Sequence, residues 1–304
     1  MSQKNARSLT VFAPAKINLF LHVTGRRDDG YHMLDSLVGF ADIGDKIEFQ
    51  PAREFSFNIK GPFAGGFNAK DKDASPDSGN LVARAAWDLA RAARRDLNCR
   101  ITLHKNLPLA SGVGGGSSDA AATLWGLMDL WGLNIKNAAP YLAGLMEALG
   151  ADVPVCMECK PAMIRGVSTV EPVEMALPEM PVLLVNPARS CMTNDIFRQF
   201  DGGFKNPVSL PDDIAEKEGF VEFLKQQSND LTAAAAQDIP EISTVLSLLD
   251  DQKGCVLSRM SGSGATCFGL FEDEEAVMDA AEQIMLAHPK WWVRGGTLNR
   301  PVRY

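Results

Sequence analysis

The sequence predicts an α+β protein made of two domains. The chain has 304 residues, which is enough for two domains of ordinary size. In the first half, an alternating segment at 99–105 runs into a glycine-rich loop and then into an apolar helix that starts at 120. Near the end, a strand at 265–271, a helix at 274–287 and a strand at 291–298 follow one another. Strands and helices in both halves are typical of the α+β class.

The boundary between the two domains is expected near residue 160. Beyond it, prolines divide the chain into short apolar runs, and residues 180–185 read as a buried strand. We therefore expect an N-terminal domain at 1–160 and a C-terminal domain at 161–304. The prolines that mark the change are Pro161, Pro172, Pro178 and Pro181.

Within the first half, residues 9–23 are rich in Val, Phe, Ile and Leu, which favours two strands or one bent strand with a break at Pro14. Residues 46–50 alternate between charged and apolar side chains and predict a half-buried strand. Residues 61–79 have no period and many turn-forming residues, so no element is assigned to them.

Two helices are expected around the glycine-rich loop. Asn80 is a suitable N-cap for an amphipathic helix whose apolar face carries Val82, Ala86 and Leu89. Another helix spans about 137–149 and ends before Gly150, a residue suited to the left-handed conformation that closes many helices.

Composition and charge exclude several classes of protein. The chain is 46% hydrophobic and 22% charged, close to the globular average, so neither a disordered nor a fibrous protein is expected. Its net charge of −8 argues against a nucleic-acid partner. No run of about 18 apolar residues predicts a membrane span, and no signal peptide is evident. Six dispersed cysteines do not form a disulfide framework, and we expect a cytoplasmic protein.

The glycine-rich loop from Gly112 to Asp119 is the most informative stretch of the sequence. Three adjacent glycines leave the backbone free of side chains, so consecutive N–H groups at a helix N-terminus can hold an anion. A Walker loop is excluded because Gly116 is followed by Ser117 and not by lysine. A dinucleotide turn is excluded because Ser117 stands where its third glycine belongs and the loop does not follow the first strand of a βαβ unit.

The wider pattern, Leu107-Pro-Leu-Ala-Ser-Gly-Val-Gly-Gly-Gly-Ser-Ser-Asp-Ala-Ala121, resembles the phosphate-binding motif of the GHMP kinases. Three further segments resemble one branch of that family, the 4-diphosphocytidyl-2-C-methyl-D-erythritol kinases of the non-mevalonate isoprenoid route. They lie at 13–32, which includes Gly-Tyr-His, at 150–154, which reads Gly-Ala-Asp-Val-Pro, and at 260–268, which is glycine-rich.

The resemblance implies a fold, a reaction and two ligands. The N-terminal domain would be a β-α domain like that of ribosomal protein S5, and the C-terminal domain would be ferredoxin-like. The reaction would be transfer of a phosphoryl group from ATP to the 2-hydroxyl of a cytidine diphosphate derivative of methylerythritol. Mg²⁺ is expected with ATP, because the triphosphate needs charge neutralisation. Ser118 or water would reach the metal, and no carboxylate ligand is assigned. We expect a monomer or a weak homodimer.

Lys16 and Asp152 are the expected catalytic residues. A buried amine in the apolar stretch at 13–21 would be costly without a partner. In the family that the chain resembles, the equivalent lysine lies beside the catalytic aspartate, which orients the acceptor hydroxyl and accepts its proton. We therefore predict a contact between Lys16 and Asp152.

The remaining candidates divide between the two ligands. The exposed aromatic and imidazole of Tyr31 and His32 suit a nucleobase, which by resemblance is cytosine. The residues expected to bind substrate are Asn18, Tyr31, His32, Thr193, Phe197, Gly262 and Gly264. Those expected to bind ATP are Lys105, Pro108, Ala110, Ser111, Gly112, Val113, Gly114, Gly115, Gly116, Ser117 and Ser118.

Other interpretations remain open at this point. A mevalonate- or homoserine-type GHMP kinase would share the glycine-rich motifs, and a non-catalytic nucleotide-binding regulator could use the same scaffold. The pair Cys156 and Cys159 has the spacing of half a zinc site, but no second pair with suitable spacing accompanies it, so two reduced cysteines are expected.

Overall fold

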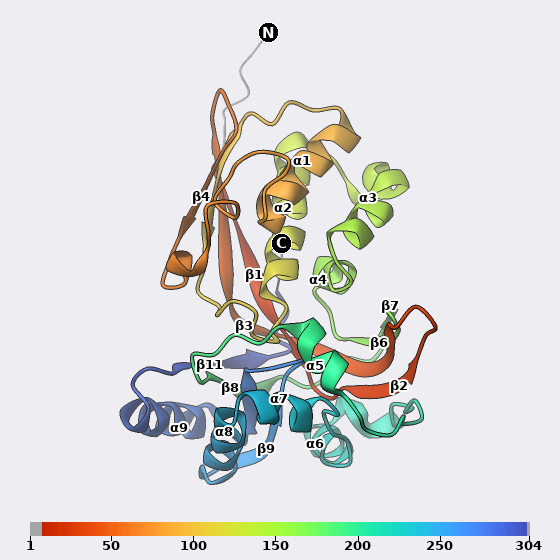
Figure 1. Cartoon of the computed structure of the whole chain (residues 1–304), viewed down its shortest axis with the longest axis vertical. Helices are drawn as coiled ribbons and strands as arrows, with labels where there is room; N and C mark the ends of the chain where they lie inside the picture. The colour runs from red at the N-terminus through yellow and green to blue at the C-terminus, as the bar shows by residue number, and fades with distance from the viewer. Residues whose placement is uncertain (1–7, 303–304) are drawn as a thin grey trace.

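The structure, a computed structural model, describes residues 8–302 and is organised around one long strand, β3 (His32–Pro51). Five strands pair with β3 along its length: β1 (Leu9–Asn18), β2 (His22–Arg26), β5 (Cys99–His104), β6 (Ala162–Gly166) and β11 (Trp292–Leu298). The main path of the sheet runs β4-β5-β3-β11-β8-β10-β9, so it passes without interruption from the first half of the chain to the second (Figure 1).

Strand β1 is bent, as its proline predicts. It pairs antiparallel with β3, and the register shifts between Pro14 and Ala15. After the shift, Lys16 lies opposite Phe40 and Asn18 opposite Val38. The proline therefore divides β1 into two stretches, and the second one carries the predicted catalytic lysine.

Four helices cover the upper part of the sheet in Figure 1: α1 (Leu81–Ala93), α2 (Gly115–Trp131), α3 (Ile135–Leu149) and α4 (Val153–Glu158). Asn80 caps α1 as predicted, since its side-chain oxygen accepts a hydrogen bond from the Val82 amide at 2.9 Å. Helix α2 packs on β1 and β3, and its apolar residues form the first core cluster with β5 and α1. The edge of this part is completed by β4 (Ser56–Lys60), and β7 (Thr169–Pro172) pairs with β6.

The lower part of the molecule holds β8 (Met180–Asn186), β9 (Cys255–Met260) and β10 (Cys267–Phe271), with β11 beside β8. Its helices are α5 (Thr193–Gln199), α6 (Lys217–Lys225), α7 (Thr232–Asp238), α8 (Glu241–Asp250) and α9 (Glu274–Ala287). A second core cluster joins the two parts, because Ile17 and Leu37 from the first half pack with Leu184 and Phe268 from the second.

The structure corrects two expectations about element bounds. Helix α2 begins at Gly115 and not near residue 120, because the last glycines of the loop already have helical conformation. The strand expected at 46–50 is the end of a twenty-residue strand. Residues 35–41 of that strand are buried on both faces and therefore do not alternate between apolar and polar side chains.

Residues 61–79 contain one short 3₁₀ helix (Ala64–Gly66) and otherwise turns and irregular chain. Within residues 8–302, no helix is both long and apolar enough to cross a bilayer.

Close packing between α2 and β3 yields a stability prediction. Gly126 on α2 faces the ring of Phe49 on β3, and a Cβ at this glycine would overlap the ring. Gly126→Ala should therefore lower the free energy of unfolding by about 1–3 kcal/mol, the usual cost of overpacking a core. Urea denaturation measures the change.

The matched control is Gly144→Ala on α3, where an added Cβ has no neighbour within 4 Å. Alanine is the better helix former, so this variant should gain about 0.5–1 kcal/mol. Equal effects of the two substitutions would contradict the packing argument.

Candidate active site

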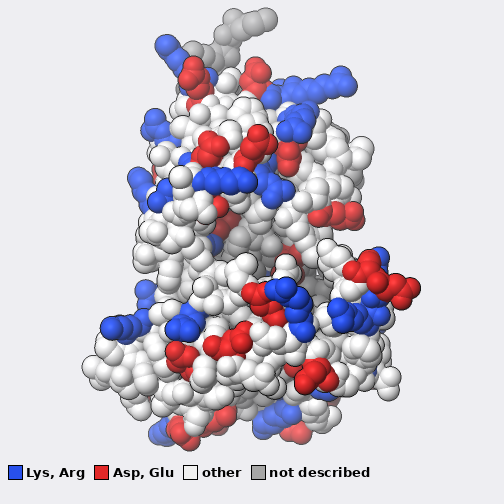
Figure 2. All heavy atoms as spheres, viewed as in Figure 1, with Lys and Arg blue, Asp and Glu red and all other residues white. Residues whose placement is uncertain are grey.

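A cleft of about 1120 Å³ lies between the upper and lower parts of the molecule. Figure 2 shows this face hollowed between the two parts. The cleft is lined by segments from both: the end of β1, the turn between β2 and β3, the glycine-rich loop, the start of α4, the start of α5 and residues 260–268, the third glycine-rich segment. All four motifs found in the sequence therefore contribute to one cavity.

Lys16 and Asp152 meet in this cleft, as predicted. The Lys16 Nζ donates a hydrogen bond to Asp152 Oδ2 at 2.7 Å. Lys16 is buried on β1, whereas the side chain of Asp152, at the N-cap of α4, is 35% exposed. The ammonium therefore holds one carboxylate oxygen while the carboxylate stays accessible from the cleft. A carboxylate fixed in this way can orient a hydroxyl group and accept its proton.

Asn18 lies two residues beyond Lys16 on the same strand and lines the same cleft. Its Nδ2 donates to the hydroxyl of Ser36 at 2.8 Å, which fixes the amide orientation. Its Oδ1 is buried and has no hydrogen-bond partner among the described residues. An unpaired buried acceptor beside the cleft suits a ligand hydroxyl.

The glycine-rich loop ends in the N-terminus of α2. Gly112 and Gly114 have φ values of 79° and 62°, which favour glycine, and Gly114 is the N-cap of the helix. A Cβ on Gly114 would lie 3.1 Å from the Cβ of Lys16. The loop therefore brings the first amides of α2, where the helix dipole is positive, next to the Lys16 side chain.

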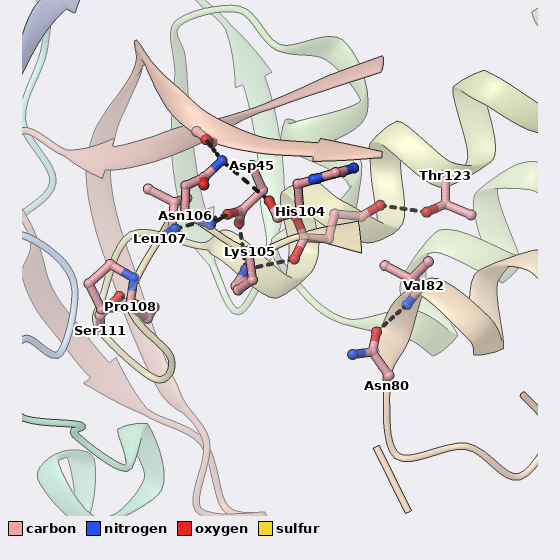
Figure 3. Close-up of polar contacts among 12 residues, drawn as sticks. Asp45, Asn80, Val82, His104, Lys105, Asn106, Leu107, Pro108, Ser111 and Thr123 are labelled. Atoms are coloured by element: carbon pink, nitrogen blue, oxygen red, sulfur yellow. Dashed lines mark hydrogen bonds and ion pairs between the residues drawn. The ribbon is translucent and has the colours of Figure 1, made fainter. Parts of the chain in front are cut away.

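A buried charge cluster supports this loop from below. The Lys105 Nζ donates to Asp45 Oδ2 at 2.5 Å and to Asp119 Oδ2 at 2.6 Å, and all three side chains are buried. The other oxygen of Asp45 accepts hydrogen bonds from the amides of Asn106 and Leu107 (Figure 3). The cluster thereby ties β3, the end of β5 and α2 together beneath the loop.

The cluster contains two carboxylates and one ammonium group. Burial, followed by the charge of Asp45, raises the pKa of Asp119 well above its usual value. Burial alone would lower the pKa of Lys105, but Asp119 and Asp45 together raise it. Lys105 therefore stays charged, and Asp119 binds a proton more readily than an ordinary aspartate does.

The opposite end of the cleft carries aromatic groups. The ring of His32 stacks on Phe197 with centroids 5.3 Å apart and meets Phe200 edge-on at 5.9 Å. Burial and then the nearby Arg26 lower the pKa of His32, so its imidazole is neutral at pH 7 and keeps both a donor and an acceptor nitrogen. Tyr31 is 63% exposed at the rim. This end suits a flat heterocycle that offers hydrogen-bonding edges.

Family models match both halves of the chain. Residues 80–160 match the model described as GHMP kinases N terminal domain, and residues 218–288 match GHMP kinases C terminal. A relative from Paramagnetospirillum magneticum, named 4-diphosphocytidyl-2-C-methyl-D-erythritol kinase, is 43% identical over 94% of this chain and 97% of its own length. The chain belongs to the GHMP kinase family.

Other relatives of this GHMP kinase agree with that result. A protein of the same name from Cereibacter sphaeroides is 46% identical over 93% of this chain and 96% of its own length. A crystal structure of 4-(cytidine 5'-diphospho)-2C-methyl-D-erythritol kinase is 31% identical, covers 96% of this chain and 100% of its own, and superimposes with a TM-score of 0.77. Mevalonate kinase from L. major, at 15% identity and a TM-score of 0.68 with full coverage of both chains, shares the fold.

Most of the residues expected from the sequence of this kinase line the cleft. Three do not. The side chain of Val113 is buried in the second core cluster, the hydroxyl of Ser118 is fully enclosed, and Gly264 packs against Met260 and Ile242. Those that do line it are Lys16, Asn18, Tyr31, His32, Lys105, Pro108, Ala110, Ser111, Gly112, Gly114, Gly115, Gly116, Ser117, Asp152, Thr193, Phe197 and Gly262. The ligand contacts assigned to all of these residues stay predictions.

Sequence reasoning missed Asp45, Asp119 and Phe200. Asp119 is the last residue of the loop motif, and its side chain could have been paired with Lys105, the one charged residue directly before the loop. No local signal indicated Asp45, because 60 positions separate it from Lys105. The structure also gives Lys105 two carboxylate partners, so its ammonium is part of the buried cluster beneath the loop.

Two oxygen atoms in this kinase suit Mg²⁺, a cation that prefers oxygen ligands. The Ser118 hydroxyl and Asp119 Oδ1 are buried beneath the glycine-rich loop, and neither has a hydrogen-bond partner among the described residues. Within residues 8–302, no group of three or more His, Cys, Asp or Glu residues could hold a metal ion by itself. These two oxygens would therefore hold a metal ion only together with oxygens of a bound nucleotide.

The charge cluster predicts how pH affects stability. The pKa of Asp119 in the folded state lies above its ordinary value of 3.8, so the folded protein binds more protons at this site. As the pH rises from 3.8 through the folded-state pKa, ionisation of Asp119 lowers the free energy of unfolding. Asp119→Asn removes this loss and should be more stable than the wild type at about pH 8, with a smaller difference at about pH 5.

Chemical denaturation at the two pH values measures the difference. Asp129→Asn, an exposed carboxylate on the same helix, is the control and should leave the pH dependence unchanged. An Asp119→Asn protein that loses more stability than the wild type as the pH rises would contradict the prediction.

Proposed function

We propose that this GHMP kinase transfers the terminal phosphoryl group of ATP to the 2-hydroxyl of 4-diphosphocytidyl-2-C-methyl-D-erythritol. One observation carries the proposal: the Lys16–Asp152 pair lies in a single cleft that has an anion-binding loop on one side and aromatic groups on the other. Relatives with 43–46% identity over nearly the whole chain are named as kinases of this compound.

ATP would bind with its phosphates on the glycine-rich loop. Amides at the N-terminus of α2 point toward the phosphates and stabilise their negative charge. Phosphoryl transfer proceeds through a loose transition state in which charge spreads over the phosphoryl oxygens, so fixed N–H groups contribute mainly by positioning and electrostatics. The loop therefore holds the donor in line with the acceptor.

The acceptor hydroxyl would lie against Asp152. The carboxylate accepts the hydroxyl proton late in the reaction, because a loose transition state lets the proton leave after most of the P–O bond has broken. The Lys16 ammonium keeps the carboxylate oriented through the 2.7 Å hydrogen bond. Asn18 Oδ1 is free to accept a hydrogen bond from substrate.

The cytidine would lie at the aromatic end, where Tyr31, His32 and Phe197 offer ring faces and His32 offers two ring nitrogens. Thr193 and Gly262 also line the cleft, and the diphosphate would pass beside them. Mg²⁺ would be held by Ser118, Asp119 and oxygens of the nucleotide. When bound, the metal neutralises charge on the triphosphate.

We further propose that residues 1–160 and 161–304 act as the two domains, and that the kinase works in the cytoplasm as a monomer or weak homodimer. The net charge of −8 supports a small-molecule substrate and not a nucleic acid.

The direct test is incubation of the protein with ATP, Mg²⁺ and the cytidylated methylerythritol, followed by mass spectrometry of the product. The substrate should gain one phosphoryl group. Mevalonate and homoserine serve as alternative acceptors. Phosphorylation of either one in preference to the cytidylated compound would overturn the proposed substrate, and nucleotide binding without any transfer would favour a regulator.

Asp152→Asn should lower kcat by about 10²–10⁴-fold, the usual contribution of a positioned acid–base group. The amide keeps the shape of the side chain but cannot accept the hydroxyl proton, so the KM values should change little. Steady-state kinetics with both substrates measures the effect. Asp129→Asn, remote on α2, should retain wild-type rates, and a fully active Asp152→Asn protein would exclude the proposed role.

The double variant Tyr31→Ala/His32→Ala separates this substrate from acceptors without a nucleobase. Loss of base stacking should raise KM for the cytidylated substrate on the order of 10- to 100-fold, because each stacked base contributes about 1–3 kcal/mol. KM for ATP should stay within about twofold. An unchanged KM for the cytidylated substrate would show that the aromatic end does not bind the base.

A further inference from the structure

Ser261 joins two segments of the active site through one atom. It follows β9 and opens the third glycine-rich segment, and its side chain is fully buried. Its hydroxyl oxygen accepts a hydrogen bond from the backbone N–H of Asn18 at 3.0 Å and donates one to the carbonyl of Gly112 at 2.9 Å. The end of strand β1 and the start of the phosphate-binding loop therefore share a single hydroxyl group.

Close backbone packing surrounds this hydroxyl. The amide of Lys16 donates to the carbonyl of Val113 at 3.0 Å, which is a second connection between β1 and the loop. Gly112 lies so close to the carbonyl of Ser261 that any Cβ at this position would overlap it. The strand, the loop and the third glycine-rich segment are thus packed against one another without intervening side chains.

Asn229 fixes the backbone on both sides of Ser261. Its Nδ2 donates to the carbonyls of Met260 at 2.7 Å and Gly262 at 2.8 Å. Its Oδ1 accepts the amide of Leu231 at 3.0 Å, so the buried side chain is itself held in place. The peptide that carries Ser261 therefore has little freedom to rotate its hydroxyl away from Asn18 and Gly112.

Arg259 holds the same strand from the neighbouring residue. Its guanidinium donates to the carbonyl of Leu19 at 2.6 Å and to two carbonyls at the end of α6, those of Leu224 and Gln227. Burial lowers the pKa of Arg259 to about 10, so the group remains charged at pH 7. Two residues of the C-terminal half, Arg259 and Ser261, thus bind the last residue of β1, Asn18, and the residue that follows it, Leu19.

We infer that Ser261 is a positioning residue that sets the distance between the phosphate-binding loop and the acceptor-binding residues of β1. The inference rests on the proposed function, since it concerns how ATP and the acceptor hydroxyl are aligned. The hydroxyl of Ser261 is buried and contacts neither ATP nor the acceptor. It acts through Asn18 and Gly112, and its loss leaves one N–H and one carbonyl without their partner.

A positioning role and a merely structural role differ in their effect on catalysis. Displacement of reacting groups by about 1 Å can cost on the order of 10²-fold in rate, because phosphoryl transfer depends on alignment. A structural role would lower the melting temperature and leave the active folded fraction with normal kcat. The measurement must therefore compare variants that lose the same kind of buried hydrogen bond.

The test compares Ser261→Ala with Thr266→Val. Thr266 lies in the same segment, is equally buried, and uses its hydroxyl to accept a hydrogen bond from Asn186 at 3.0 Å. Both variants should lose stability, Ser261→Ala the more, because the Ser261 hydroxyl makes two hydrogen bonds and the Thr266 hydroxyl accepts one. Only Ser261→Ala should lower kcat, by about 10- to 100-fold, with smaller changes in the KM values. Ser261→Cys, whose thiol is a weak donor and acceptor, should fall between the wild type and the alanine variant.

Amide hydrogen exchange on the same proteins needs no turnover. In Ser261→Ala, exchange should accelerate at Asn18 and in the segment 110–118, whereas Thr266→Val should leave both as in the wild type. Equal kcat in the two variants, or equal exchange at Asn18, would overturn the inference. A wild-type protein that phosphorylates no acceptor would instead refute the proposed function, and the exchange data would then decide the role of Ser261 alone.

Discussion

The register of strand β3 is the constraint on which the rest of the structure depends. Five strands pair with it, and the positions of Lys16 and Asn18 follow from their pairing with Phe40 and Val38. Because side chains alternate across a sheet, a slip of one residue would turn both groups away from the cleft. The bulge after Pro14 absorbs the bend of β1 before this stretch begins, so the pairing near the site stays regular.

Much of the fold could be predicted from local patterns. The amphipathic period of α1 and its asparagine cap, the helix α9 and the strand β8 are all found where the sequence indicates them. The long strand β3 could not be predicted in full, because its middle is buried on both faces and has no alternation to reveal it. The sequence predicts the start of α2 about five residues after its actual start at Gly115, because glycine disfavours helices in general and its use at a helix N-terminus is a local exception.

The site was predictable to the extent that its residues lie in local motifs. A lysine in an apolar segment needs a partner, and the resemblance to a known family identified Asp152 as that partner; the structure places the two 2.7 Å apart. Asp45, Asn229 and Ser261 gave no comparable signal. Each acts through contacts with residues at least 30 positions away in the sequence, and one sequence contains no record of such contacts.

The second core cluster limits how the enzyme can be divided into separate fragments. Ile17 and Leu37 pack there against Leu184 and Phe268, so neither half of the chain can complete this cluster alone. A fragment cut near residue 160 would present these apolar side chains to water and would be expected to aggregate. Recovery of activity would require co-expression of both fragments, so that each shields the other as it is synthesised.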